Sequence, residues 1–363
     1  MSNDLGEFFN RRRLYALGMV RFTVLASGSK GNSTVVTGGR TRILVDAGLS
    51  CRELFRRMRL VDEEPETLDA IIITHEHSDH VGGVAVTARK LGIPVYFTEG
   101  THRAWMRWLS PRRQMTYAQW LEQCRRQAAE RQAESDGLAA EGEPDEADPM
   151  VAGDERMACE ASDGEPSGTD GAVSDSEIAL SPDGARERPS RREDPTWLPG
   201  VMYFQAGQPF EIGDIAISPF TIPHDAADPV GFVFKAEGVR MAFATDLGYI
   251  PPNVKAQLKG VDLMLLESNH DLEMLRDGPY PWQVKQRVLS RVGHLSNDTA
   301  SGFLEDGYDG QAAYVILAHL SESNNLPELA RVAAERALQG RGNLLANRLL
   351  LAEQHQPLSS IYF

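Results

Sequence analysis

Short hydrophobic runs recur along the first part of the chain, and each ends in a glycine, a histidine or another polar residue. Between about residues 20 and 120, the β-rich runs occupy residues 20–27, 41–48, 69–75 and 93–98. Runs of this length with turn residues at their ends predict strands. Residues 80–92 place apolar and small side chains on one helical face, which predicts a helix before the fourth strand.

The second part, about residues 197–363, continues the alternation. Strands are predicted over 201–205, 210–222, 230–237, 239–246, 261–268 and 313–319, and amphipathic helices over 281–293 and 326–339. Each part predicts a sheet with helices on one side. Two such halves, packed sheet against sheet, give an α/β fold with four layers, an αββα sandwich. We therefore expect a single domain over residues 19–363.

A low-complexity segment, residues 125–196, interrupts that domain. Its central part, 133–184, holds 16 acidic residues and one basic residue, which leaves 36 of each sign elsewhere and accounts for the net charge of −15. A segment so poor in apolar residues cannot bury enough surface to fold, so we expect a disordered acidic insertion. It is interpreted either as a solvated loop or as a regulatory arm that masks a basic surface. Because the rest of the chain has no net charge, an anionic substrate is not excluded.

Other features narrow the class of protein. Residues 1–18 are expected to be a flexible N-terminal extension, because Met19 would be a natural start. They lack the apolar core and cleavage site of a secretory signal. Nowhere does an apolar run approach the ~20 residues of a membrane helix, so no membrane association is expected. The chain's three cysteines are too few for a disulfide framework, and a reducing cytoplasm is the expected location. No pattern predicts an oligomeric state.

The candidate chemistry begins where the third predicted strand ends. Residues 74–80 read THEHSDH, which places three histidines and an aspartate within six residues. His75 and His77 are two apart on extended backbone, so their side chains share one side and can hold one ion. Asp79 and His80 lie in the following turn and can hold a second ion beside it. No histidine follows His75 by four residues, which excludes the helical HExxH zinc motif.

HxHxDH after a hydrophobic strand, with LVDAG upstream, resembles the metallo-β-lactamase superfamily. Within it, the chain resembles the YycJ/WalJ type, a bacterial branch near RNase J and RNase Z. This closer resemblance rests on seven runs: ASGSKGNS (26–33), THEHSDH (74–80), PHDAADPVGF (223–232), ATDLG (244–248), LESNHD (266–271), GPYPWQVKQRVLSRVGHLSN (278–297) and LAHLSESNN (317–325).

With that resemblance, three further residues at strand ends complete the expected metal ligands. His224 joins His75 and His77 on one ion, and His319 joins Asp79 and His80 on the other. Asp246 is expected to bridge the two ions. Every one of these ligands offers nitrogen or oxygen, which suits two divalent ions of zinc, manganese or iron.

A two-ion site without a cysteine ligand fits phosphodiester hydrolysis, in which a hydroxide shared by the ions attacks phosphorus. Besides the ligand Asp79, two residues are expected to act in catalysis. Asp46 would orient a metal-bound histidine. His294 resembles the histidine that the family places near the scissile phosphate. Glu267 and His270 are expected to be structural residues or to support the ligands.

The turn SGSKGNS, residues 27–33, is a candidate phosphate-binding loop, because it follows the first strand at the sheet edge that carries the metal ligands. Its glycines allow close backbone approach, and its polar side chains offer donors. The expected substrate-binding residues are Ser27, Ser29, Lys30, Asn32 and Ser33.

The sequence thus predicts a dinuclear metal-dependent phosphodiesterase. The resemblance implies a nuclease that acts on nucleic acid, in the first place a DNA exonuclease. The alternative is a small-molecule cyclic phosphodiesterase of the PhnP type, for which a deep closed pocket would speak. A thioester or lactam hydrolase and a non-catalytic nucleic-acid scaffold are weaker alternatives, because the chain keeps all seven ligands.

Overall fold

The computed structural model describes residues 19–110, 126, 194–339 and 348–363. Residues 1–18 and nearly all of the segment 125–196 lie outside the described residues, as do the extension and the insertion that were predicted there. In the part that is described, the longest helix has 13 residues, and none is long and apolar enough to cross a membrane.

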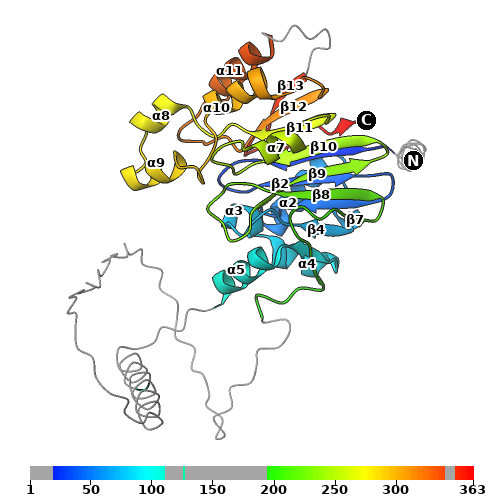
Figure 1. Ribbon diagram of the computed structural model, residues 1–363. Helices are drawn as coiled ribbons and strands as arrows, with labels where there is room; N and C mark the ends of the chain where they lie inside the picture. The colour runs from blue at the N-terminus through cyan, green and yellow to red at the C-terminus, as the bar shows by residue number, and fades with distance from the viewer. Residues whose placement is uncertain (1–18, 111–125, 127–193, 340–347) are drawn as a thin grey trace, which may run out of the picture. The chain divides into compact units, whose positions relative to one another are not determined.

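Two seven-stranded sheets form the centre of the molecule (Figure 1). The first sheet contains, in spatial order, β14 (Ile361–Tyr362), β1 (Arg21–Ala26), β2 (Ser33–Thr37), β3 (Arg42–Val45), β4 (Ala70–Ile72), β5 (Val95–Phe97) and β6 (Val201–Tyr203). The second contains β13 (Arg348–Leu351), β12 (Tyr314–Ala318), β11 (Leu263–Glu267), β10 (Val239–Ala244), β9 (Val230–Ala236), β8 (Ile215–Thr221) and β7 (Phe210–Ile212). In both sheets, four neighbouring strands run parallel: β3 to β6 and β10 to β13.

Helical segments follow most of the parallel strands. In the first half of the chain they are α2 (Cys51–Leu60), η1 (Pro65–Thr67), α3 (Ser78–Val81), α4 (Val84–Leu91) and α5 (Glu99–Leu109). In the second half they are α7 (Pro252–Gln257), α8 (Leu272–Asp277), α9 (Trp282–Val288), α10 (Asn297–Gly302), η2 (Phe303–Gly307) and α11 (Pro327–Gln339).

The alternation of side chains along each strand divides the interior into three apolar layers. On β3, Ile43 faces the layer between the two sheets, whereas its neighbour Leu44 packs with Leu54 and Trp105 of the helices outside the first sheet. Successive side chains on a strand point to opposite faces, which explains this division. The third layer joins the outer face of the second sheet to α11. The predicted αββα sandwich is confirmed, and Figure 1 shows helices on both outer faces.

The assignment of strands to sheets differs from the simple picture of one sheet for each half of the sequence. Strand β6 comes from the second half but pairs in parallel with β5, and β14 at the end of the chain pairs with β1. The run 210–222, predicted as one strand, forms the hairpin β7–β8, which turns at Gly213 with φ 57°. The chain therefore closes the first sheet with strands from its second half.

Candidate metal centre

The strand ends bring the polar side chains together. Asp46 follows β3, His75 and His77 follow β4, Asp246 follows β10, and His319 follows β12. These four strands belong to the parallel parts of the two sheets, and their carboxyl ends meet at one edge of the sandwich. Ligands of open α/β sheets commonly bind at that edge, because loops there start from fixed strands.

Three of these residues have an unusual backbone. Asp46, Asp246 and His319 have φ values of 58°, 61° and 57°, in the left-handed region that side chains other than glycine rarely adopt. Such conformations cost about 1–3 kcal/mol each and concentrate at functional sites. All three follow directly or almost directly on a buried strand, so the sheet holds them in place.

A close approach between two loops fixes the turn that carries Asp79 and His80. The backbone N–H of Ala47 donates to the carbonyl of His80 at 2.8 Å, and that of Asn32 donates to the carbonyl of Asp79 at 2.7 Å. A Cβ atom on Gly48 would lie only 1.7 Å from the Asp79 carbonyl oxygen, so this position requires glycine. The glycine of LVDAG therefore allows the loop after β3 to support the HEHSDH turn.

The first predicted set of ligands converges. His75, His77 and His224 place one nitrogen each within 4.8 Å of one another. His224 Nε2 lies 3.2 Å from His77 Nδ1, and the rings of His75 and His224 are 4.9 Å apart at their centres. These three nitrogens could hold one ion.

The second predicted set converges beside it. Asp79, His80 and His319 also place one donor atom each within 4.8 Å of one another. Asp246 lies between the sets: its Oδ2 atom is 3.5 Å from His80 Nε2, and its Oδ1 atom is 3.3 Å from His319 Nδ1. Asp246 also forms a compact group with His75 and His80. The Asp246 carboxylate therefore lies within reach of residues of both sets.

Asp46 lies behind the cluster and contacts His80. Its Oδ2 atom is 2.8 Å from His80 Nδ1, and its two oxygens accept hydrogen bonds from the N–H and the hydroxyl of Thr74 at 2.9 Å each. Asp46 is completely buried. Because its contact engages Nδ1, the Nε2 atom of His80 remains for the cluster, as expected of an orienting carboxylate.

Burial and mutual charge shape the electrostatics of the cluster. Burial, followed by the repulsion of neighbouring histidines, lowers the pKa of His75 well below its ordinary value and favours the neutral ring. Burial also acts against the cation of His319, but Asp246, Asp79 and Glu267 raise its pKa to about 10. Burial also disfavours the ionised form of Asp79, yet His80 and His319 hold the pKa of this carboxyl far below its usual range. Asp79 therefore stays ionised, which is the form that binds cations, whereas burial raises the pKa of Asp46 behind it.

Buried atoms without partners show that this cluster fits a divalent ion. Within the described residues, the buried atoms His75 Nε2 and Asp246 Oδ2 make no hydrogen bond. A buried polar atom without a partner costs about 1–3 kcal/mol, so native proteins rarely retain one without a reason. Coordination by an ion would satisfy both atoms, and the nitrogen and oxygen donors suit zinc, manganese or iron.

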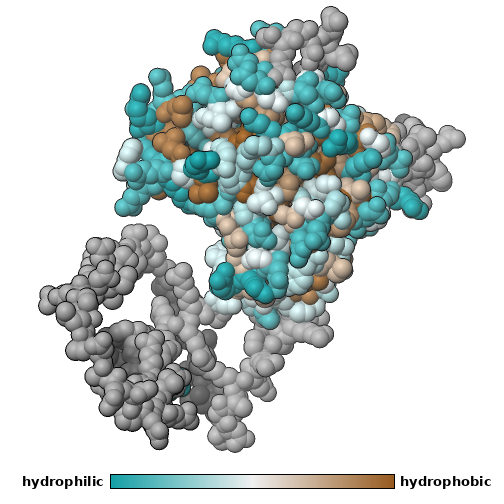
Figure 2. All heavy atoms as spheres, viewed as in Figure 1, coloured by the Kyte–Doolittle hydropathy of each residue, from teal (hydrophilic) through white to brown (hydrophobic). Residues whose placement is uncertain are grey.

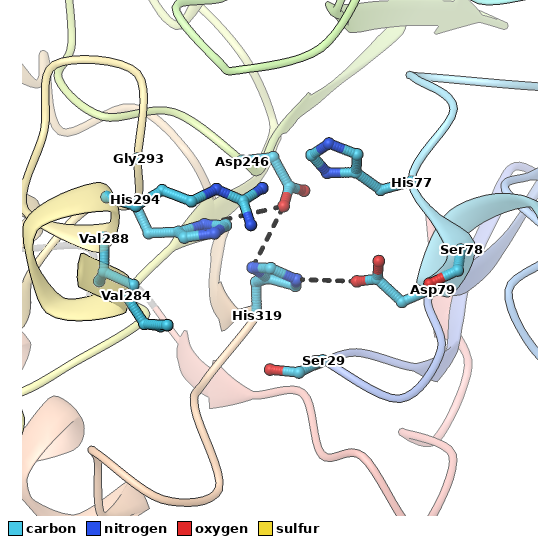
Figure 3. Close-up of a pocket in the computed structure, with 11 residues that line it drawn as sticks. Ser29, His77, Ser78, Asp79, Asp246, Val284, Val288, Gly293, His294 and His319 are labelled. Atoms are coloured by element: carbon cyan, nitrogen blue, oxygen red, sulfur yellow. Dashed lines mark hydrogen bonds and ion pairs between the residues drawn. The ribbon is translucent and has the colours of Figure 1, made fainter. Parts of the chain in front are cut away.

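An open cavity of about 310 Å³ lies over the cluster. Figure 3 shows His77 and Asp79 on one side of it, Val284, Val288 and His294 on the opposite side, and Ser29 at its edge. Asp246 and His319 lie between these walls. The cavity is lined by Ser29, His77, Ser78, Asp79, Asp246, Val284, Arg287, Val288, Gly293, His294 and His319.

Of the five predicted substrate-binding residues, Ser29 lines this cavity and the other four do not. Lys30 instead pairs with Glu322 at 2.6 Å. The Asn32 amide donates to Asp79 Oδ2 at 3.1 Å, and the hydroxyl of Ser27 accepts from the His319 N–H at 2.8 Å. Ser27, Asn32 and Ser33 are buried, so the loop supports the ligands from behind.

His294 lines the cavity and is held by Glu267. His294 Nδ1 lies 2.7 Å from Glu267 Oε1, and His319 Nδ1 lies 3.0 Å from the same oxygen. The second oxygen of Glu267 accepts hydrogen bonds from the backbone N–H groups of Leu247 and Leu295. Burial disfavours the Glu267 carboxylate, but His294 and His319 lower its pKa far below its usual range. Glu267 therefore fixes the orientation of both rings.

Two further residues complete the picture of the site. Arg287 lines the cavity and pairs with Asp225; the run GPYPWQVKQR marked this segment in the sequence, but no role was predicted for the arginine. His270 lies outside the cavity lining and is 1% exposed, and burial lowers its pKa to about 4.

The sequence as a whole identifies the family. The model of the metallo-β-lactamase superfamily matches residues 26–284, more than half of the chain. The chain belongs to the metallo-β-lactamase superfamily. It is accordingly a metal-dependent hydrolase, and the predicted resemblance is confirmed.

The similarity to two curated relatives extends over most of the chain. It is 29% identical to the exodeoxyribonuclease YycJ of Bacillus anthracis over 89% of this chain and 90% of that protein. It is 30% identical to the exodeoxyribonuclease WalJ of Streptococcus pneumoniae serotype 2 over 86% of both chains. Among solved structures, Zn²⁺-bound PqqB from Methylobacterium extorquens matches the fold with a TM-score of 0.53 at 14% identity, covering 93% of this chain and 99% of that one.

Proposed function

We propose that the protein is a nuclease that uses two divalent ions to hydrolyse phosphodiester bonds, and that it acts as an exonuclease on DNA. The observation that carries this proposal is the pair of adjacent donor sets, with Asp246 close to both, beneath an open cavity. The names of the two relatives, both exodeoxyribonucleases, support DNA as the substrate.

In this proposal, His75, His77 and His224 hold one ion, and Asp79, His80 and His319 hold the other. Bound ions supply Lewis acidity, which lowers the pKa of a water molecule and neutralises charge on the phosphate. Asp46 keeps Nε2 of His80 directed at the cluster. Against the effect of burial, neighbouring histidines lower the pKa values of Asp79, Asp246 and Glu267, so these carboxylates supply negative charge that attracts cations.

His294 is proposed to act on the phosphate from the wall of the cavity. Its Nδ1 atom contacts Glu267, which leaves Nε2 for the substrate; with both ring nitrogens protonated, Nε2–H can donate a proton or a hydrogen bond to the phosphate or to the leaving oxygen. His294 Nδ1 lies 3.8 Å from Asp246 Oδ1, which places the ring beside the proposed bridging ligand. Glu267 is a positioning residue, because it acts through His294 and His319.

The cavity is accessible to a polymer as well as to a small cyclic phosphate. The cavity is partly open, and Arg287, which pairs with Asp225, lies on its wall. A deep closed pocket, which a small-molecule phosphodiesterase would favour, is not what lies above the donor sets in the described residues. A long anionic chain can enter such an open site from the side.

The substrate panel that tests this proposal contains one DNA sequence as a linear single strand, a circular single strand and a duplex, the matching RNA, and a cyclic nucleotide phosphate. We expect degradation of the linear DNA from its ends, with the circular strand intact. Hydrolysis of the cyclic phosphate alone would support the small-molecule alternative, and equal cutting of the circular strand would exclude an exonuclease.

The role of His294 has its own test. We expect His294→Ala to keep its metal content and to lose roughly 10²–10⁴-fold in kcat, as for a positioned proton donor. The matched control is His355→Ala, which removes a histidine whose side chain is 73% exposed and lies outside the cavity lining. Loss of metal together with activity in His294→Ala would show that His294 is a ligand, and the proposed role would be wrong.

A further inference from the structure

Helix α9, at the wall of the cavity, is attached without a buried face. None of its seven residues is buried, although its sequence predicts an amphipathic helix. By contrast, α11 buries Ala330, Ala334 and Ala337 against its sheet. Polar contacts hold α9: Lys285 Nζ donates to the carbonyls of Arg276 and Gly278 at 2.7 and 2.8 Å. A helix held in this way leaves its apolar side chains available for a ligand.

One face of α9 lines the cavity, and the opposite face is exposed to solvent. Val284, Arg287 and Val288 line the cavity, and Figure 3 shows the two valines directed into it. At 3.6 residues per turn, Trp282 and Leu289 lie on the opposite face of the helix. There they are 65% and 51% exposed. Figure 2 shows hydrophobic residues gathered on the surface over α8 and α9.

The charge of this segment indicates which ligand would cover the exposed face. Residues 279–292 contain three cations and no acidic residue. Lys285 is held by backbone carbonyls and Arg291 by the ring of Tyr249 at 4.5 Å, so both keep their charge, whereas Arg287 on the cavity wall pairs with Asp225. Exposed aromatic and apolar side chains interleaved with cations are typical of surfaces that bind single-stranded nucleic acid, where bases stack and phosphates meet the cations.

We propose that α9 is a stacking platform for single-stranded nucleic acid, on which Trp282 stacks with a base beyond the nucleotide in the cavity. This inference rests on the proposed nuclease function and adds the strand-binding element to it. A protein partner would cover the same apolar side chains, but it would not require the cations of this segment.

The geometry of the helix sets a minimum length for a nucleic acid that contacts both the cavity and Trp282. The width of a helix with its side chains is about 10–12 Å, and this width separates Trp282 from the face that lines the cavity. A substrate must therefore extend past the nucleotide at the scissile bond before a base reaches Trp282. A dinucleotide is too short to benefit, whereas a 20-mer spans both faces.

The experiment compares kcat/KM of the wild type, Trp282→Ala and Trp282→Phe on a single-stranded 20-mer and on a dinucleotide of the same sequence. The measured quantity is kcat/KM on the 20-mer divided by kcat/KM on the dinucleotide. Because Trp282→Ala loses one base stack, we expect this ratio to fall by roughly 5–150-fold. Because phenylalanine keeps an aromatic face, Trp282→Phe should recover most of the ratio. The matched control is Trp108→Ala on α5, since Trp108 is 57% exposed and lies outside the cavity lining.

Three results would overturn the platform. An unchanged ratio in Trp282→Ala would do so while leaving the nuclease function intact. An equal loss on both substrates would indicate a structural effect or a partner surface in place of base stacking. An equal loss in Trp108→Ala would show a general effect of surface tryptophans. If the wild type cleaves neither nucleic acid, the proposed function itself fails, and that outcome is separate from the other three.

Discussion

Two clusters of buried charged side chains lie at opposite ends of the first sheet, and they are built differently. Strand β1 is antiparallel to β2, which is antiparallel to β3, so Arg21 lies at the end of the sheet where β3 begins. There Arg21 pairs with Glu63, and the hydroxyl of Thr23 donates to the other oxygen of Glu63 at 2.9 Å. Both partners of the ion pair are buried, with 6% and 1% exposure.

At the other end of the sheet, histidines and carboxylates converge in two adjacent sets of potential ligands. Buried atoms of His75 and Asp246 make no hydrogen bond among the described residues, and Asp46, Asp246 and His319 hold strained backbone conformations. At Glu63, burial raises the pKa, and Arg21 only partly offsets it. At Asp79, neighbouring histidines outweigh burial and lower the pKa. The first cluster stabilises the fold, whereas the second is arranged for a ligand from outside.

Breaking the first cluster should have the largest effect on stability. Glu63→Gln removes the carboxylate partner of Arg21 and is expected to lower the free energy of unfolding by about 3–5 kcal/mol, as for a broken buried pair. Urea unfolding at neutral pH measures this. The fraction that stays folded should retain its metal content, because the pair lies at the far end of the sheet.

The control for that measurement is an exposed pair of the same type. Arg59 Nη2 lies 2.9 Å from Glu66 Oε1, and their side chains are 58% and 63% exposed. Glu66→Gln is expected to change the free energy of unfolding by about 1 kcal/mol or less. Equal effects of the two substitutions would contradict a structural role for the buried pair.

A smaller effect is expected from a change behind the second cluster. In Asp46→Asn, the amide nitrogen would face the N–H at Nδ1 of His80, so the ring could no longer keep Nε2 directed at the cluster. We expect metal affinity to fall by roughly 10–100-fold with the fold retained, the usual effect of losing such an orienting carboxylate. Competition with a chromophoric chelator measures the affinity. Asp214→Asn, in the β7–β8 turn, should leave it unchanged.

Much of the fold could be predicted from the sequence, because the buried strands have short hydrophobic runs with polar residues at their ends. Local pattern does not specify which strands pair across long separations. The sequence therefore did not indicate that β6 and β14 join the first sheet. The amphipathic pattern of α9 predicted a buried face, but the helix has no neighbouring layer to pack against within the described residues.

The site shows the same division. All seven expected ligands come together, because strand ends in a parallel sheet have a common edge, although their binding of metal stays a prediction. The direction of a loop side chain depends on partners that are distant in the sequence. The hydroxyl of Ser27, for example, accepts a hydrogen bond from the backbone N–H of His319. For that reason the sequence could not indicate which residues of SGSKGNS face the cavity. The contact between Glu267 and His294 likewise has no local signature.

Counting the bound ions tests whether the second cluster holds two of them. The wild type, His224→Ala and His319→Ala would be saturated with Zn²⁺ or Mn²⁺, separated from free metal by gel filtration, and analysed for metal and protein together. His224 belongs to one donor set and His319 to the other. We expect two ions per chain in the wild type and one in each variant. Saturation of the wild type at a single ion would contradict this expectation.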